Sequence, residues 1–246
     1  HITFLPPPRR TTPPALRAAR PREALLDAAL LCLRERGYEA TAVDDILSAT
    51  RLTKGAFYFH FDSKEEFALA AIDRALARFW PEIEKAMRTR GDDPFTPIYA
   101  LFKLFSGDCT HGCIFGNLSA EMAARSPTIR LRLAGVFGCW TGALVFVVND
   151  LKTRGAIAAE ADSSTLARLI LAQLQGALLL GKLEPELNHL DIHAHALTTL
   201  LAATRGVIPM GPLDGAIKRA VASASFPSTL SASPFLLCLP SLSHSL

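Results

Sequence analysis

The chain has 246 residues, half of them hydrophobic, so it is long enough to bury a sizeable core. Its formal net charge is only +3, so charge alone does not indicate nucleic-acid binding. The five cysteines are odd in number and lack the spacing of a disulfide scaffold, which speaks against a disulfide framework and favours reduced thiols in a cytoplasmic protein.

The first 20 residues are rich in proline and arginine and have little periodicity, so we expect a disordered basic arm over 1–20. Five arginines, the last of them Arg22, precede the first acidic residue, Glu23. Such an arm can meet phosphates or acidic lipid, and it can equally be a solvated tail. The N-terminus lacks the apolar stretch of a signal peptide, which also predicts a cytoplasmic protein.

The helical pattern begins after this arm. Leucines at helical spacing predict a first helix over about 22–36, and Gly37 suits the position just past its end. A second short helix is expected to begin at Thr41, because Asp44 follows three positions later as a variant of the capping box.

Two further helices follow closely. Thr53 is the expected cap of a short third helix, and Ser63 with Glu66 is another capping-box variant that opens a long fourth helix. The fourth helix should run to about Arg88, with a kink or break at Pro81.

The sequence after the fourth helix also predicts helices, since no stretch of alternating apolar and polar residues bounded by turns indicates a strand. The expected helices are 94–105, 117–124, 128–153, 163–183 and 190–204. The predicted fold class is therefore all-α, with a head at 21–67 and a helical body at 68–205. Residues 206–246 form a Ser/Pro-rich tail in which no function is readable.

One stretch of the body could suggest a membrane. Residues 133–149 carry no charge over 17 positions, which is the lower limit for a spanning helix. Glycines and a threonine dilute its hydrophobicity, and helical sequence continues on both sides. We therefore expect a buried central helix and no membrane partner.

The short second and third helices and the turn between them have the pattern of a helix-turn-helix, in which the second helix enters the DNA major groove. The recognition helix would be 53–60, where Gly55 and Ala56 leave room for close approach. The alternative is an ordinary helical hairpin with an aromatic core. Phe57 and Phe61 are assigned to the core in either case.

The segment TAVDDILSATRLTKGAFYFHFDSKEEF makes this prediction specific, because it resembles the N-terminal signature of the TetR/AcrR family of bacterial regulators. The resemblance covers roughly residues 22–70. It implies an all-helical homodimer with a DNA-binding head and a variable ligand-binding body, usually a repressor that releases its operator when a small molecule binds. The DNA contacts expected from pattern and resemblance together are Thr41, Arg51, Thr53, Lys54, Gly55, Ala56, Tyr58, Phe59, His60 and Lys64.

Arg51 departs from the family, which usually has glycine at this turn position. If the position has a positive φ, arginine costs about 1 kcal/mol there. Contact between Arg51 and a DNA phosphate would compensate for this cost.

The body contains a second informative segment, HGCIFGNLSAEMAARSP at 111–127. It resembles a subgroup with a Gly-Cys-x-x-Gly-Asn-Leu-x-x-Glu pattern, which includes electrophile-sensing repressors and an acrylate-responsive regulator. In the electrophile sensors the cysteine of this segment is the sensing thiol and works with a lysine on a later helix, positions that correspond here to Cys113 and Lys182. The alternative is that Cys113 only packs at a loop–helix junction and Lys182 is a solvated helix end.

A sensing role for Cys113 is consistent with thiol chemistry, because an ammonium and a helix N-terminus both lower the pKa of a nearby thiol. The predicted ligand or redox residues are Cys113, Lys182, Phe105, His111, Asn117 and Trp140. The aromatic members are more often core than pocket. Cys109, His111 and Cys113 would need a fourth ligand to hold a metal, and we predict neither metal nor cofactor.

The combined prediction is a cytoplasmic, homodimeric repressor that binds double-stranded operator DNA and is released by a small-molecule or thiol-reactive inducer. The helices at 163–183 and 190–204 are expected to form the dimer interface. The rival hypotheses are a membrane-associated helical protein and an enzyme that uses Cys113 or a histidine. No Ser/His/Asp or Cys/His spacing supports catalysis, so we predict that the protein is not an enzyme.

Overall fold

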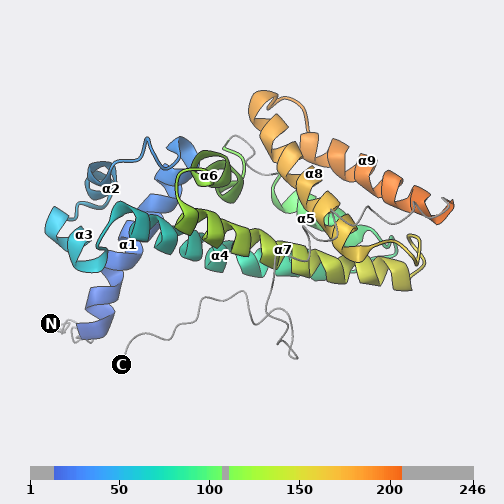
Figure 1. Ribbon diagram of the computed structural model, residues 1–246, viewed down its shortest axis with the longest axis horizontal. Helices are drawn as coiled ribbons and strands as arrows, with labels where there is room; N and C mark the ends of the chain where they lie inside the picture. Colours follow the sequence, from blue (N-terminus) through green and yellow to red (C-terminus); the bar gives the residue numbers. More distant parts are fainter. Residues whose placement is uncertain (1–13, 107–110, 207–246) are drawn as a thin grey trace, which may run out of the picture. The chain divides into compact units, whose positions relative to one another are not determined.

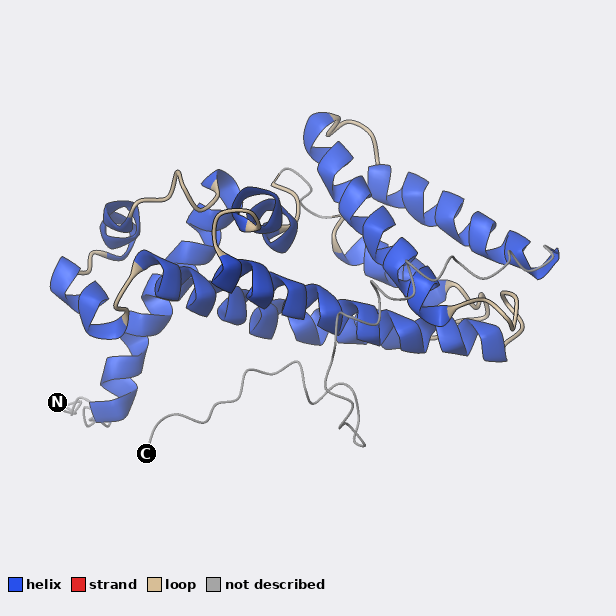
Figure 2. Ribbon diagram, viewed as in Figure 1, coloured by secondary structure: helices blue, strands red, loops and turns tan. Residues whose placement is uncertain are grey.

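The computed structural model describes residues 14–106 and 111–206, and within those ranges every regular element is a helix (Figure 2). The predicted all-α class is therefore confirmed. The chain divides into two compact units, His1–Arg74 and Ala75–Leu246. Most of the predicted basic arm and all but the first residue of the predicted tail lie outside the described residues.

The N-terminal unit is built from α1 (Pro14–Arg36), α2 (Val43–Thr50), α3 (Lys54–His60) and the first part of α4 (Lys64–Arg88) (Figure 1). α1 packs on α2 and α3, which also contact each other. The core of the unit is apolar and includes Leu25, Leu26, Ile46, Phe57 and Phe61.

The start of α1 corrects the sequence prediction. α1 begins at Pro14 and not near residue 22, so the predicted disorder does not extend through residue 20. The added turns consist mainly of alanine, leucine and arginine, which are strong helix formers. Pro21 therefore lies inside the helix, whereas its sequence position had suggested a first turn.

α4 is continuous through Pro81, so the predicted break does not occur. The border between the two compact units falls within this helix, after Arg74. Residues of α4 beyond that border, including Trp80 and Ile83, are buried in the C-terminal unit.

The rest of the C-terminal unit is helical, and its core is built around α7 and α8 (Figure 1). α8 packs on both α7 and α9, α6 packs on α7, and α5 packs on α9. The helices are α5 (Thr96–Leu104), α6 (Ile114–Met122), α7 (Pro127–Thr153), α8 (Ser163–Leu183) and α9 (His189–Ala203), followed by a 3₁₀ turn, Thr204–Gly206.

α7 and α8 are each long and apolar enough to cross a membrane by length and composition alone. On α7, the buried residues Leu133, Val136, Trp140, Leu144 and Val148 recur at intervals of three or four. This spacing marks a helix face packed in a protein core, which favours the predicted central helix over a membrane span.

Candidate functional site

α3 presents two different faces. Phe57 and Phe61 are buried, as predicted. Their ring centroids lie 5.6 Å apart, and those of Phe57 and Phe61 lie 5.0 and 4.9 Å from the ring centroid of Phe67 on α4. Tyr58 and Phe59 are 51% and 79% exposed. Two adjacent exposed aromatic side chains make this outer face a candidate binding surface.

The first turn of α3 is fixed by Thr53. Its Oγ1 accepts a hydrogen bond of 3.2 Å from the amide of Ala56, which confirms the predicted cap. Lys54 and Gly55 are exposed beside it. A Cβ placed on Gly55 would meet only Thr53 Oγ1, at 3.8 Å, an ordinary contact. Packing within the protein therefore does not require glycine at this position.

The turn between α2 and α3 contains Arg51 in the left-handed conformation, with φ of 56°. It is the one non-glycine residue with positive φ in the described part of the chain. The prediction of a positive φ at this position is confirmed. The side chain is exposed.

Thr41 differs from the prediction. Its side chain is buried, and its hydroxyl donates a 2.6 Å hydrogen bond to the carbonyl of Gly37. The cap of α2 is Ala42, one residue later, whose amide donates to Asp45 Oδ2 at 2.9 Å. The predicted cap at Thr41 with Asp44 is therefore wrong by one residue, and the hydroxyl joins the end of α1 to the following turn.

Lys64 lies in the first turn of α4. Ser63 Oγ accepts from the amide of Glu66 at 3.1 Å, and Glu66 Oε2 accepts from the amide of Asp62 at 2.7 Å, so the predicted Ser63/Glu66 cap is confirmed. Lys64 Nζ lies 4.4 Å from the centre of the Tyr38 ring. This cation–π contact orients the ammonium group of Lys64 towards Tyr38.

The remaining predicted contacts, Ala56 and His60, are half-buried on α3. The His60 ring packs edge-on against Phe59, with centroids 5.0 Å apart. With the exception of Thr41, the predicted DNA contacts are thus at least partly accessible. They lie along α3, the turn before it and the first turn of α4.

In the C-terminal unit, the start of α6 brings together four of the predicted sensing residues. The helix begins at Ile114 with Cys113 as its cap, three residues before the predicted start. Asn117 donates from Nδ2 to the carbonyl of His111 at 2.7 Å and accepts from Lys182 Nζ at 3.3 Å. Lys182 of α8 is thereby joined to the segment that contains Cys113.

Two glycines make this arrangement possible. Gly112 has φ of 67°, and a Cβ there would lie 2.8 Å from Lys182 Cδ. A Cβ on Gly116 would lie 2.6 Å from Oε1 of Gln175, also on α8. Any larger residue at either position would displace a side chain of α8.

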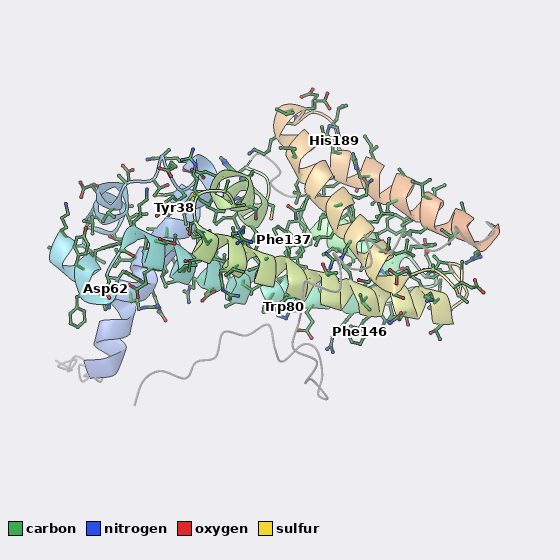
Figure 3. All side chains as sticks on the ribbon, in the orientation of Figure 1. Tyr38, Asp62, Trp80, Phe137, Phe146 and His189 are labelled. Carbon is green, nitrogen blue, oxygen red and sulfur yellow. The ribbon has the colours of Figure 1, made fainter. Side chains whose placement is uncertain are left out.

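Cys113 and Trp140 are both buried, and Phe105 is half-buried. The Trp140 ring packs against Phe105, Phe115 and Phe137 at centroid distances of 5.8, 6.4 and 6.5 Å. Phe137 lies on α7 (Figure 3). Trp140 belongs to the same helix. This set of four rings, the Trp140 cluster, adjoins the first turn of α6 through Phe115.

Sequence reasoning missed Gln175. The signal that could have indicated it was the presence of two glycines, Gly112 and Gly116, close together at the start of α6. A glycine leaves room for a side chain of another helix to approach the backbone. Which helix lies opposite is not contained in local sequence.

Within the described ranges, no group of three histidine, cysteine, aspartate or glutamate residues has the geometry to hold a metal ion. Cys109, the first member of the Cys-x-His-x-Cys cluster, lies outside those ranges. His189 and His193 are instead bonded to Glu184 and Gln173, at 2.7 and 2.8 Å.

Comparison with known proteins covers both units. Residues 25–71 match the family described as "Bacterial regulatory proteins, tetR family", and residues 102–197 match "Tetracyclin repressor-like, C-terminal domain". The chain is 32% identical over 199 residues to the transcriptional regulator AcuR of Cereibacter sphaeroides, covering 72% of this chain and 89% of that protein.

Two further proteins that resemble this chain are also regulatory proteins by their names. The chain is 29% identical over 178 residues to the HTH-type transcriptional repressor DhaR of Mycobacterium sp. strain GP1, covering 69% of this chain and 86% of that one. The crystal structure of a regulatory protein TetR from Rhodobacter sphaeroides superposes with a TM-score of 0.64 at 28% identity, covering 74% of this chain and 97% of that one.

Proposed function

This chain belongs to the TetR family of bacterial transcriptional regulators, and we propose that it is a repressor released from its operator by a thiol-reactive small molecule. The protein is a DNA-binding helix-turn-helix regulator with a C-terminal ligand-binding domain. The proposal adds the contact residues, the class of inducer, a homodimeric assembly and a cytoplasmic location. It assigns no catalytic role.

The proposed DNA surface is the outer face of α3 with the residues on either side of it. Support comes from the exposure of Thr53, Lys54, Tyr58 and Phe59 on a helix whose other face is buried. Hydroxyl and ammonium groups bind phosphates and base edges, and the exposed rings supply apolar contact with thymine methyl groups. Lys64 and Arg51 are proposed as phosphate contacts on either side.

The proposed sensor is Cys113. Its thiolate adds to the electrophilic carbon of an α,β-unsaturated carbonyl compound, so a carbon–sulfur bond forms and the carbon–carbon π bond breaks. The electron pair passes to the α-carbon, which takes a proton from water. The adduct enlarges a buried residue that stands between Gly112 and Gly116 in the chain, two positions where even an added Cβ would collide with Lys182 or Gln175. An adduct that extends towards either glycine would displace these side chains.

Such displacement favours the body conformation that does not bind operator. The single observation that carries this proposal is the hydrogen-bonded link from His111 through Asn117 to Lys182, because it fixes the cap of α6 to α8 next to the thiol.

Homodimerisation is proposed through α8 and α9. Leu169, Leu180 and Leu183 are exposed on one face of α8 at helical spacing, and Gly176 on the same face has no heavy atom within 4 Å of its Cβ position. Leu200 on α9 is also exposed. An apolar face with a small residue near its centre suits close packing against a second copy.

The test is a gel shift with DNA flanking the protein's own gene, with and without N-ethylmaleimide. The wild-type complex should dissociate on alkylation, and the Cys113→Ser complex should persist. Cys32→Ser is the matched control, since burial raises the pKa of the Cys32 thiol and that residue lies in the N-terminal unit. Release of Cys113→Ser by the reagent would reject the sensing role, and failure of the wild type to shift the DNA at low salt would reject the regulator itself.

A further inference from the structure

Three buried hydrogen-bond donors in the helical body have no acceptor among the described residues. They are Nε1 of Trp80 on α4, Nε1 of Trp140 on α7 and Nε2 of Gln175 on α8. Native proteins satisfy nearly all such groups, because an N–H group removed from water without an acceptor costs free energy. A pair of them in one region therefore requires a reason.

Two of the three donors, those of Trp140 and Gln175, border the first turn of α6. Gln175 Oε1 lies 2.6 Å, and Cys113 Cβ 3.6 Å, from the position that a Cβ on Gly116 would take. Trp140 packs edge-on against Phe115, the residue before that glycine, with centroids 6.4 Å apart. The indole and the amide thus adjoin neighbouring residues of α6, next to the cysteine.

The chemistry of the two donors restricts what can satisfy them. An indole N–H only donates, and the free atom of the Gln175 amide is its nitrogen, since the oxygen is the atom turned towards Gly116. Both groups are uncharged, so they can donate to an oxygen of a neutral carbonyl or of a carboxylate. The neighbouring surface is the aromatic Trp140 cluster, which suits a small flat carbon skeleton.

We propose that Trp140 Nε1 and Gln175 Nε2 bind the carbonyl or carboxylate oxygen of a small organic inducer, whose carbon skeleton packs on the Trp140 cluster. This inference rests on the proposed function, because it defines the inducer class for the same site. It adds a recognition step that precedes reaction with Cys113 and does not require it. Gln175 becomes a specificity residue that rejects hydrocarbons lacking an acceptor.

The chain offers a direct readout, since it contains two tryptophans, Trp80 and Trp140. The full-length ¹⁵N-labelled protein should give two indole N–H signals, assigned with the Trp80→Phe variant. Cyclohexanone and benzoate supply the two kinds of oxygen, and neither can alkylate a thiol. Cyclohexene and benzene are the hydrocarbon controls.

The expected result is a saturable downfield shift of the Trp140 indole proton with cyclohexanone, benzoate or both, and none with the hydrocarbons. The ligand that titrates at the lower concentration identifies carbonyl or carboxylate as the preferred oxygen. The Trp80 indole N–H, which is likewise buried without an acceptor in the described part of the chain, serves as internal control and should not shift. Gln175→Leu should weaken binding at least tenfold, whereas Gln173→Leu, which removes a residue bonded to His193, should not.

A Trp140 signal that neither oxygen compound moves, or that the hydrocarbons move equally, overturns the proposal. So does unchanged affinity in Gln175→Leu. The titration contains no DNA, so its outcome is independent of operator release: binding without release would reject the proposed repressor mechanism, and release without a Trp140 shift would reject this inference.

Discussion

At the scale of single residues, α3 separates the residues that hold the fold together from those offered to DNA. Phe57 and Phe61, one helical turn apart, supply its buried contacts, and the residues between them and before them are exposed or half-buried. Substitutions of residues offered to DNA should therefore alter DNA binding with little loss of stability. Gly55 on α3 and Arg51 in the preceding turn are two positions that test this.

Gly55→Ala should raise the stability of the protein and weaken operator binding. No neighbour blocks the added methyl group, and alanine is favoured over glycine in a helix by about 0.5–1 kcal/mol. If the backbone of α3 approaches DNA closely here, affinity should fall by about tenfold or more, the size of a lost base contact. Thermal unfolding and fluorescence anisotropy with operator DNA measure the two effects.

Gly142→Ala is the control, because a Cβ there also meets no atom within 4 Å but the residue lies on α7. It should raise stability and leave DNA affinity unchanged. Undiminished operator binding by Gly55→Ala would show that α3 does not approach DNA at this residue.

Arg51→Gly should also stabilise the protein, by about 1 kcal/mol, because glycine adopts the positive φ of this turn without strain. If Arg51 contacts a phosphate, the slope of log affinity against log salt should fall by about 1 in magnitude. Arg51→Lys keeps both the charge and the strain, so it should change neither quantity much. An unchanged salt slope in Arg51→Gly would mean that the arginine is not a DNA contact.

At the scale of elements, the junction of α6 and α8 depends on Gly112. Gly112→Ala combines backbone strain with a contact of 2.8 Å to Lys182 Cδ, so it should cost about 1–2 kcal/mol and displace Lys182 from Asn117. Gly155→Ala is a matched control with φ of 63° and no atom within 4 Å, so it carries the strain alone.

Urea unfolding of both variants separates the cost of backbone strain from the cost of the contact with Lys182. Only Gly112→Ala should also alter the response to N-ethylmaleimide in the gel shift. If both variants lose the same stability and both keep the wild-type response, the Lys182 contact plays no part in signalling.

The elements show where sequence reasoning succeeds and where it stops. Thr53 and Ser63 were predictable as caps because capping depends on residues within one turn. The cap of α2 was misplaced by one residue because Thr41 and Asp44 have suitable side chains, yet Thr41 turns inward to Gly37. Gln175 was missed because its significance depends on Gly116, a residue of another helix that is distant in sequence.

At the scale of the whole molecule, operator binding by two heads requires two copies of the chain. Leu183→Asp with Leu200→Asp should place charges on the proposed α8–α9 interface and produce monomers, because a buried unpaired carboxylate is costly. Sedimentation velocity should show the change in mass, and operator affinity should fall with it.

The control is Leu131→Asp on α7, a leucine exposed to a similar extent. It should leave both assembly and DNA affinity intact. Circular dichroism establishes that each variant remains helical. A double variant that stays dimeric would move the interface away from α8 and α9.

The separation of buried from exposed residues on α3 also has an evolutionary consequence. A lineage can exchange residues on the outer face of this helix while Phe57 and Phe61 keep it in place. Operator preference can therefore diverge between gene copies without an intermediate that fails to fold. Selection on the body, in contrast, meets a tighter constraint at Gly112 and Gly116, where nearly every substitution displaces a partner side chain. We expect related regulators to differ more readily in the DNA they read than in the backbone geometry at the start of α6.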